Sequence, residues 1–139
     1  MLINVDFDGT VVTHEFPKVG RDIGAVPILK KLVDNGHKLI LFTMRSERPF
    51  FNFNGTTRDV LQEAVDWFKE HDIPLHGINA DPDQKNWTNS PKSYAQLMID
   101  DTALGCPIKV DKTMSQRPYV DWEKIEELLI EKGIIKNDN

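Results

Sequence analysis

Apolar residues occur in several short runs along the chain. Leu2–Val5, Lys38–Thr43, Leu75–Ile78 and Ala95–Ile99 are such runs, and Gly, Pro or charged residues stand close to their ends. We expect four strands here, because a strand of a parallel sheet is covered on both faces and reads as a nearly continuous apolar run. A further short strand is expected near Ile108.

Longer segments between these runs carry apolar residues at intervals of three and four. That spacing places them on one face of a helix and predicts helices over 23–35, 57–71 and 121–132. Asp121 is a suitable N-cap for the last of them. Strands alternating with helices predict a single α/β domain over residues 1–139, a Rossmann-like three-layer sandwich with a mainly parallel sheet.

Polar residues stand where the predicted strands end. Asp6 and Asp8 follow the first strand, Thr43 ends the second, and Asp100 and Asp101 follow the fourth. In a parallel α/β sheet, ligands bind in the crevice beyond the carboxyl ends of the strands. The fold would therefore bring side chains from distant parts of the chain into one pocket.

This group of residues suits phosphate chemistry. Crowded carboxylates repel one another, and Mg2+ would neutralise them, because it prefers octahedral oxygen coordination shared among carboxylates, waters and phosphate. A carboxylate beside the metal can attack phosphorus, which splits one difficult displacement into two easier ones. A second carboxylate two residues away can protonate the leaving oxygen and later activate water. Thr43 and Lys92 can bind phosphate oxygens, and Lys92 offsets the charge that builds in the transition state.

Four segments of the chain resemble, in the same order, the motifs of the haloacid dehalogenase (HAD) superfamily. Residues 6–10 (Asp-Phe-Asp-Gly-Thr) look like its first motif, Asp-x-Asp-Gly-Thr. Residues 39–43 resemble its second motif, an apolar strand ending in Thr or Ser, and residues 98–101 (Met-Ile-Asp-Asp) resemble its fourth. Lys92 resembles the lysine of the third motif. The resemblance covers the chain from residue 2 to about residue 108 and implies a HAD-like core.

The resemblance also implies roles for individual residues. Asp6 would be the nucleophile that is transiently phosphorylated, and Asp8 the general acid/base. Mg2+ would be held by Asp6, by the backbone carbonyl of Asp8, and by Asp100 and Asp101, one directly and one through water. The implied activity is Mg2+-dependent hydrolysis of a phosphomonoester, since a dehalogenase of this superfamily would normally lack the second Asp. The substrate-binding set would be Gly9, Thr10, Thr43, Met44, Arg45 and Lys92.

The chain leaves no room for a folded cap domain, because segments 11–22 and 79–91 are too short to form one. The sequence therefore resembles the capless type of the superfamily. Such members often act on exposed or macromolecular phosphates, or use a neighbouring subunit as a lid. The oligomeric state, including a homo-oligomer, stays open at this point.

Some assignments have alternatives. Lys85 is the alternative to Lys92, which we favour because it stands just before a strand. Arg45 and Arg48 could clamp a second anionic group or be solvated. The phenylalanines of segment 50–53 could cover the pocket, seat a ring, form a subunit contact or pack under a loop.

Composition narrows the class of partner. The formal net charge is −5, which counts against extended nucleic-acid binding and leaves a phosphorylated small molecule or nucleotide as the expected substrate. The single cysteine, Cys106, cannot form an internal disulfide and suits a reducing compartment. The N-terminus has no signal-peptide pattern and no run is long enough to span a bilayer, so we expect a cytoplasmic protein with no membrane partner.

Two other functions compete with a phosphatase. A signalling receiver domain also gathers Asp, Thr and Lys on an α/β sheet, but its phospho-acceptor Asp ends the third strand, where this chain has Asn79. A catalytically silent HAD fold that serves as a binding module is the second alternative. The presence of both Asp6 and Asp8 counts against it.

Overall fold

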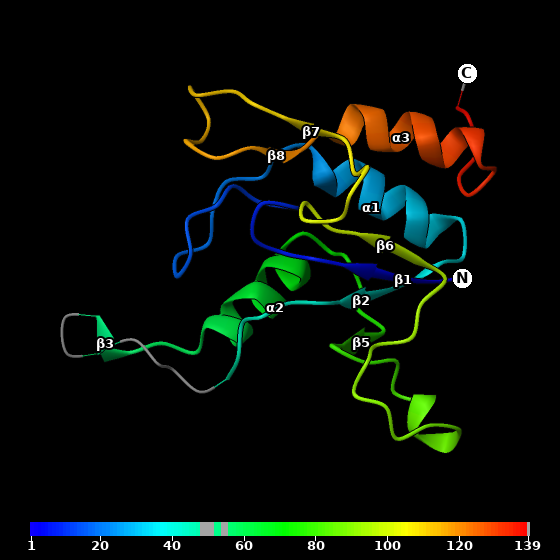
Figure 1. Ribbon diagram of the computed structural model, residues 1–139, viewed down its shortest axis with the longest axis horizontal. Helices are drawn as coiled ribbons and strands as arrows, with labels where there is room; N and C mark the ends of the chain where they lie inside the picture. Colours follow the sequence, from blue (N-terminus) through cyan, green and yellow to red (C-terminus); the bar gives the residue numbers. More distant parts are fainter. Residues whose placement is uncertain (48–51, 54–55, 139) are drawn as a thin grey trace.

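Four parallel strands form the central sheet of the computed structural model, which describes residues 1–47, 52–53 and 56–138 (Figure 1). The strands in spatial order are β5 (Gly77–Ile78), β2 (Lys38–Leu41), β1 (Leu2–Val5) and β6 (Leu97–Ile99). Ile3 of β1 lies opposite Leu39 of β2 on one side and Leu97 of β6 on the other. All four predicted strands are therefore confirmed, and the two that carry the aspartates are neighbours.

The predicted helices are also confirmed, each shorter than its apolar pattern by a few residues. They are α1 (Ala25–Asp34), α2 (Val60–Glu70) and α3 (Trp122–Glu131). Asp121 caps α3 as expected, because its side chain accepts a hydrogen bond from the Lys124 N–H. Asp59 caps α2 in the same way through the Gln62 N–H. Among the described residues, no helix is both long and apolar enough to cross a bilayer.

The core lies on one face of the sheet. Alternate residues of β1, β2 and β6 point to this face, and the buried ones form one cluster with residues of all three helices. Phe7, just beyond β1, joins this cluster through an edge-to-face contact with Trp67 of α2, with ring centroids 5.8 Å apart. The strand residues of the cluster are Ile3, Val5, Leu39, Leu41 and Ile99, and the partly buried Leu97 packs against it.

The opposite face is covered differently. Asn4 points to this face and donates from Nδ2 to the Ser93 carbonyl (3.2 Å), while the Ser93 hydroxyl donates to Asn4 Oδ1 (2.9 Å). Ser93 belongs to the connection between β5 and β6, whose only helical element is the three-residue 3-10 helix η1 (Gln84–Asn86). A three-layer sandwich was expected, but the layer that covers Asn4 is irregular structure. The reason is that this connection is polar, contains proline and lacks the apolar spacing of a helix.

Two short antiparallel pairs complete the described part of the chain. β3 (Asn52–Phe53) pairs with β4 (Thr56–Thr57), and β7 (Ile108–Lys109) pairs with β8 (Tyr119–Val120). The short strand expected near Ile108 is confirmed, but its partner β8 was not predicted, because two residues show no periodicity. Arg48, Phe50 and Phe51, for which alternatives were left open, lie outside the described residues.

Candidate functional site

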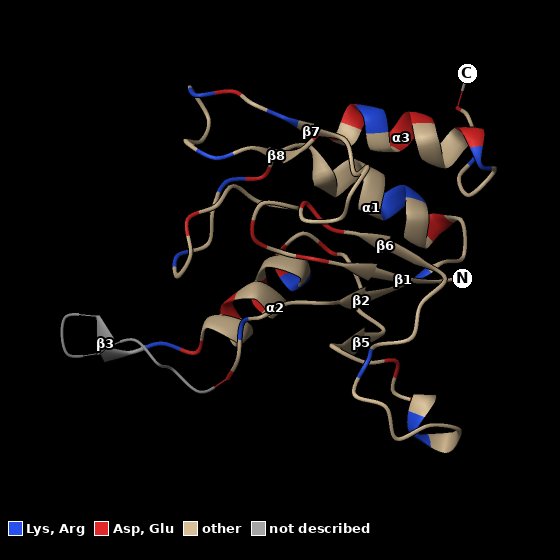
Figure 2. Cartoon of the chain, in the orientation of Figure 1, with Lys and Arg blue, Asp and Glu red and all other residues tan. Residues whose placement is uncertain are grey.

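Three carboxylates meet at the edge of the sheet formed by the C-terminal ends of β1 and β6. Asp6 directly follows β1, and its N–H donates to the Ile99 carbonyl at the end of β6 (3.0 Å). Carboxylate oxygens of Asp6, Asp100 and Asp101 lie within 4.8 Å of one another. Figure 2 shows acidic residues in the segments that leave these two strands. The structure thus brings these three predicted residues together, and we call them the acidic cluster.

Thr10 links the two halves of the acidic cluster. Its buried hydroxyl donates to Asp6 Oδ2 (2.7 Å) and lies 3.3 Å from Asp101 Oδ1. The Asp101 N–H in turn donates to the Thr10 hydroxyl oxygen (3.0 Å), and the indole of Trp122 donates to the Thr10 carbonyl (2.7 Å). Thr10 was predicted to bind substrate, but these contacts assign its hydroxyl to holding two carboxylates in place.

Ionisation of Asp6 is unfavourable within the acidic cluster. Burial raises the pKa of Asp6 from 3.8 to about 8; the hydrogen bond from Thr10 opposes the rise, while the charge of Asp100 and the hydrogen bond with Asp101 add to it. A divalent cation would stabilise the ionised form of Asp6 and reduce the repulsion between the carboxylates. Three oxygen donors of this kind suit a hard cation such as Mg2+, so the donor set fits the predicted metal.

Asp8, two residues beyond Asp6, forms an ion pair with an arginine. Its Oδ1 accepts from Arg45 Nη2 (2.7 Å) and its Oδ2 accepts from Arg45 Nε (2.8 Å). This is a bidentate pair, with the Asp8 side chain 18% exposed and that of Arg45 1% exposed. The carboxylate of Asp8 is therefore turned toward Arg45, while its predicted metal contact would use the backbone carbonyl.

Arg45 was predicted to contact an anionic substrate, and the structure gives it internal partners instead. Besides Asp8, it donates to the carbonyls of Pro17, Lys18 and Val60 at 2.8–3.3 Å. Its guanidinium also lies over the ring of Phe7, 5.0 Å from the centroid. All five N–H donors of the guanidinium have acceptors within the protein, so Arg45 orients Asp8 and has no donor left for substrate.

The remaining predicted contacts are placed as follows. Gly9 follows Asp8 and has a positive φ of 81°, and its N–H donates to the Val12 carbonyl. The Thr43 hydroxyl, half-buried, accepts from the Arg45 N–H (3.1 Å), while Met44 extends into solvent. Lys92 is exposed, and among the described residues its ammonium has no hydrogen-bond or ion-pair partner. Thr43 thus adjoins Arg45, whereas the structure shows no contact of Lys92 with the acidic cluster.

Sequence reasoning missed His14: the four histidines show no partner arrangement in the sequence, which indicated a structural role for His14. His14 Nε2 lies 2.9 Å from Asp101 Oδ2, and the two side chains are 12% and 13% exposed. Asn79 was also missed: its Oδ1 accepts from the Thr43 N–H (2.8 Å). Both residues lie in connections that show no apolar periodicity. The partner of His14 is 87 residues away and that of Asn79 is 36 residues away, so neither contact could be read from the sequence.

A second group of potential ligands, which we call the histidine cluster, consists of His76, Asp81 and Asp83. His76 Nε2 lies 3.0 Å from Asp81 Oδ1, whereas Asp83 is exposed. A polar cavity of about 290 Å³ beside them is also lined by Met1, which precedes β1, and by Lys38, the first residue of β2. The histidine cluster therefore lies at the edge of the sheet opposite to the acidic cluster.

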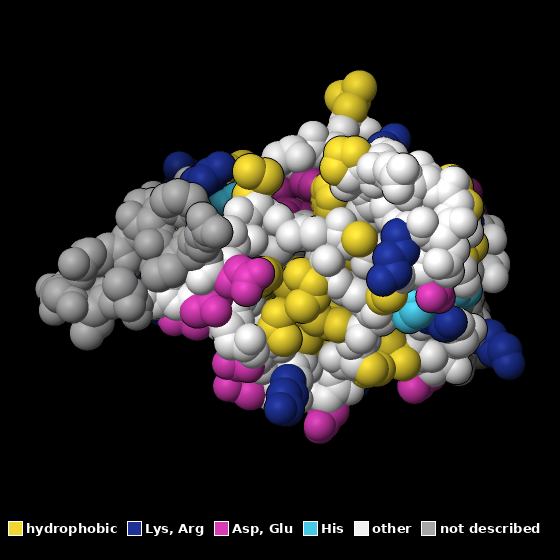
Figure 3. Space-filling view, turned by 90° about the horizontal axis from the view of Figure 1, so that it is seen from below, with side chains coloured by type: hydrophobic (Ala, Val, Ile, Leu, Met, Phe, Trp, Pro, Cys, Tyr) yellow, Lys and Arg dark blue, Asp and Glu magenta, His cyan; other side chains and the backbone are white. Residues whose placement is uncertain are grey.

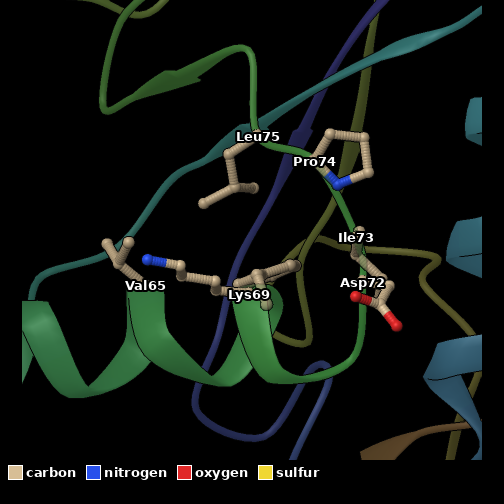
Figure 4. Close-up of a pocket in the computed structure, with 7 residues that line it drawn as sticks. Val65, Lys69, Asp72, Ile73, Pro74 and Leu75 are labelled. Carbon is tan, nitrogen blue, oxygen red and sulfur yellow. The ribbon is translucent and has the colours of Figure 1, made fainter.

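Apolar surface is found away from the acidic cluster. Figure 3 shows hydrophobic side chains gathered on the face seen from below, with charged side chains around them. A cavity of about 370 Å³ lies between the end of α2 and the segment 72–75 (Figure 4). Val65 and Phe68 of α2 line it together with Ile73, Pro74 and Leu75. Lys69 and Asp72 also line it, so the lining is mostly apolar with one residue of each charge.

Comparison with known proteins supports this fold. No family model matches the chain, and no curated protein matches it. Among solved structures, a conserved protein from Bacteroides thetaiotaomicron is 33% identical, with a TM-score of 0.70 over 95% of this chain and 91% of that chain. The chain belongs to the same family as that conserved protein. The similarity between the two chains supports the α/β architecture. It carries no information on the chemistry of the acidic cluster.

Proposed function

We propose that the protein is a capless phosphatase of the HAD-like type, which hydrolyses phosphomonoesters with Mg2+ through an aspartyl-phosphate on Asp6. The observation that carries this proposal is the acidic cluster at the C-terminal edge of a parallel sheet, with Asp8 two residues beyond Asp6. Ligand sites of open α/β sheets lie at this edge. The Asp-x-Asp-Gly-Thr motif supplies the roles of the two aspartates.

The acidic cluster would hold the cation together with the backbone carbonyl of Asp8. When bound, Mg2+ supplies positive charge that neutralises the carboxylates and the phosphate oxygens. The protein's own contribution is preorganisation. Thr10 holds Asp6 and Asp101 in a fixed relation, so little reorganisation is needed when substrate arrives.

The proposed reaction has two displacements at phosphorus. In the first, a carboxylate oxygen of Asp6 forms a bond to phosphorus, the bond to the ester oxygen breaks, and that oxygen takes a proton from Asp8. In the second, water attacks the aspartyl-phosphate, gives its proton to Asp8, and phosphate leaves. Asp6 and Asp8 return to their starting protonation states, so the net reaction is hydrolysis of the ester.

The ion pair with Arg45 leaves Asp8 able to act as a general acid and base. Each carboxylate oxygen has two lone-pair sites, and Arg45 uses one on each. One site on each oxygen therefore remains to carry the proton that Asp8 gives to the leaving oxygen and later takes from water. In this proposal Arg45 aims Asp8 at the leaving oxygen. Thr43 and Lys92 are proposed to bind phosphate oxygens; for Lys92 this requires its exposed side chain to turn toward the acidic cluster.

The proposed substrate is a small phosphorylated molecule or nucleotide. A net charge of −5 opposes binding along a nucleic-acid backbone, whereas one phosphate needs only the local charge of the cation site. Without a cap, the substrate's leaving group would be exposed to solvent or covered by another subunit.

The test is Mg2+-dependent release of phosphate from a panel of nucleotides, sugar phosphates and oligonucleotides with terminal phosphates. We expect Asp6→Asn to lower release by at least about 1,000-fold, because the nucleophile is lost. Asp83→Asn, a matched change in the histidine cluster, should release phosphate like the wild type. No release by folded, Mg2+-bound wild-type protein would contradict the proposal and favour a HAD-like binding module.

A further inference from the structure

His14 contacts the acidic cluster from outside the four motif segments. Its Nε2 lies 2.9 Å from Asp101 Oδ2. Because an ionised carboxylate only accepts hydrogen bonds, Nε2 is the nitrogen that donates. The other oxygen of Asp101 faces the hydroxyl of Thr10, so each oxygen has a neighbouring group from the segment that follows β1.

The local backbone is shaped around the imidazole. A Cβ added at Gly9 would lie 1.9 Å from His14 Nε2, which is much closer than any side chain tolerates. The φ of Gly9, 81°, is also one that favours glycine. His14 therefore packs directly on the backbone that separates Asp8 from Thr10, and its ring is only slightly exposed. A surface histidine would not need this close approach.

We propose that His14 is a positioning residue for the cation site: it holds Asp101 in the orientation in which the carboxylate binds the metal. This inference rests on the proposed function, since it takes Asp101 as a ligand. Carboxylates that bind metals are themselves held by hydrogen bonds, and loss of such a partner typically lowers metal affinity about 10- to 100-fold. In this protein His14 supplies that bond, and Gly9 makes the space for it.

The histidine cluster provides a matched control. His76 Nε2 makes a bond of nearly the same length, 3.0 Å, to Asp81 Oδ1 at the opposite edge of the sheet. Removing either imidazole deletes the same chemical group from a histidine–aspartate pair. Only the deletion of His14 should change binding of a cation at the acidic cluster.

The experiment measures the Kd of Mn2+, used as a paramagnetic substitute for Mg2+, by electron paramagnetic resonance of the full-length protein. We expect His14→Ala to raise the Kd about 10- to 100-fold. His14→Gln, which keeps an N–H donor on a side chain of similar reach, should recover most of that loss. His76→Ala should leave the Kd unchanged, and thermal unfolding of each variant checks that it is folded.

The outcomes separate this inference from the proposed function. If wild type and His14→Ala bind Mn2+ equally while Asp6-dependent phosphate release persists, the role of His14 is wrong and the phosphatase stands. Equal losses in His14→Ala and His14→Gln would also contradict the role, because the donor would then not matter. If the folded wild type binds no Mn2+ at millimolar concentration, both the inference and the proposed cation site fail.

Discussion

The two edges of the central sheet each gather three potential metal ligands, and they differ in how their charges are balanced. The acidic cluster consists of three half-buried carboxylates, and the pKa of Asp6 there is about 8. The histidine cluster pairs one buried carboxylate with an imidazole, exposes the other, and has Lys38 beside the same cavity. In both clusters one carboxylate is paired with an imidazole. Only the acidic cluster holds two further carboxylates, Asp6 and Asp100, half-buried beside that pair.

This difference is the reason why we propose the acidic cluster, and not the histidine cluster, as the cation site. A protein loses stability by burying carboxylates together, and such an arrangement is retained where a ligand offsets it. Exposed or paired groups carry no such penalty, because water and the partner stabilise the charges. Four predictions test this contrast.

The largest loss of stability at a single pH is expected from Arg45→Met, which leaves the mostly buried Asp8 without its partner. Breaking a buried ion pair by removing one side typically lowers the free energy of unfolding by about 3–5 kcal/mol. Denaturant unfolding measures this. Arg58→Met is the matched control, because the pair of Arg58 with Glu63 is about 30% exposed and should contribute less than about 1 kcal/mol. Equal losses of stability in the two variants would show that the pair of Asp8 with Arg45 contributes no more than an exposed ion pair.

Mg2+ should stabilise the folded protein through the acidic cluster. A ligand at 100 times its Kd raises the free energy of unfolding by about 2.7 kcal/mol. Thermal unfolding with and without Mg2+ measures the gain as a shift in Tm. Asp100→Asn should reduce the shift and Asp81→Asn should not. A shift that depends on Asp81 alone would transfer the cation site to the histidine cluster.

Asp6 should make the metal-free protein less stable as the pH rises. The folded state keeps a proton on Asp6 up to about pH 8, whereas the unfolded chain loses it near pH 3.8. Between these values the folded state binds more protons, so the free energy of unfolding falls with rising pH, by at most about 1.4 kcal/mol per unit. Asp6→Asn should remove this slope and be the more stable protein at pH 8. The measurement is denaturant unfolding at several pH values in the presence of a chelator. A slope that persists in Asp6→Asn would show that Asp6 does not cause it.

The smallest effect is expected from Asp83→Asn in the histidine cluster. Asp83 is exposed, so the change should alter the free energy of unfolding by less than about 0.5 kcal/mol, with or without Mg2+. Denaturant unfolding in both conditions measures it. A loss of Mg2+ stabilisation in this variant would remove the contrast between the two edges.

The position of the acidic cluster was predictable because it depends on regular structure. Asp6 and Asp100 each follow an apolar run, and parallel pairing of neighbouring strands places the ends of such runs together. His14 and Arg45 were not predictable in the same way. Their contacts with Asp101 and Asp8 depend on how irregular segments fold back over the sheet, which apolar spacing does not encode.

The sequence by itself determined the four strands of the central sheet, the three α-helices and the set of carboxylates, since hydrophobic periodicity and residue type are local properties. The tertiary structure alone decided which partner each polar side chain has. It turned Arg45 inward to Asp8, assigned the Thr10 hydroxyl to Asp6 and Asp101, and set His14 against Gly9. The physical reason is that a hydrogen bond needs its two atoms within about 3 Å. That precision comes from packing of the whole chain and not from the pattern of any one segment.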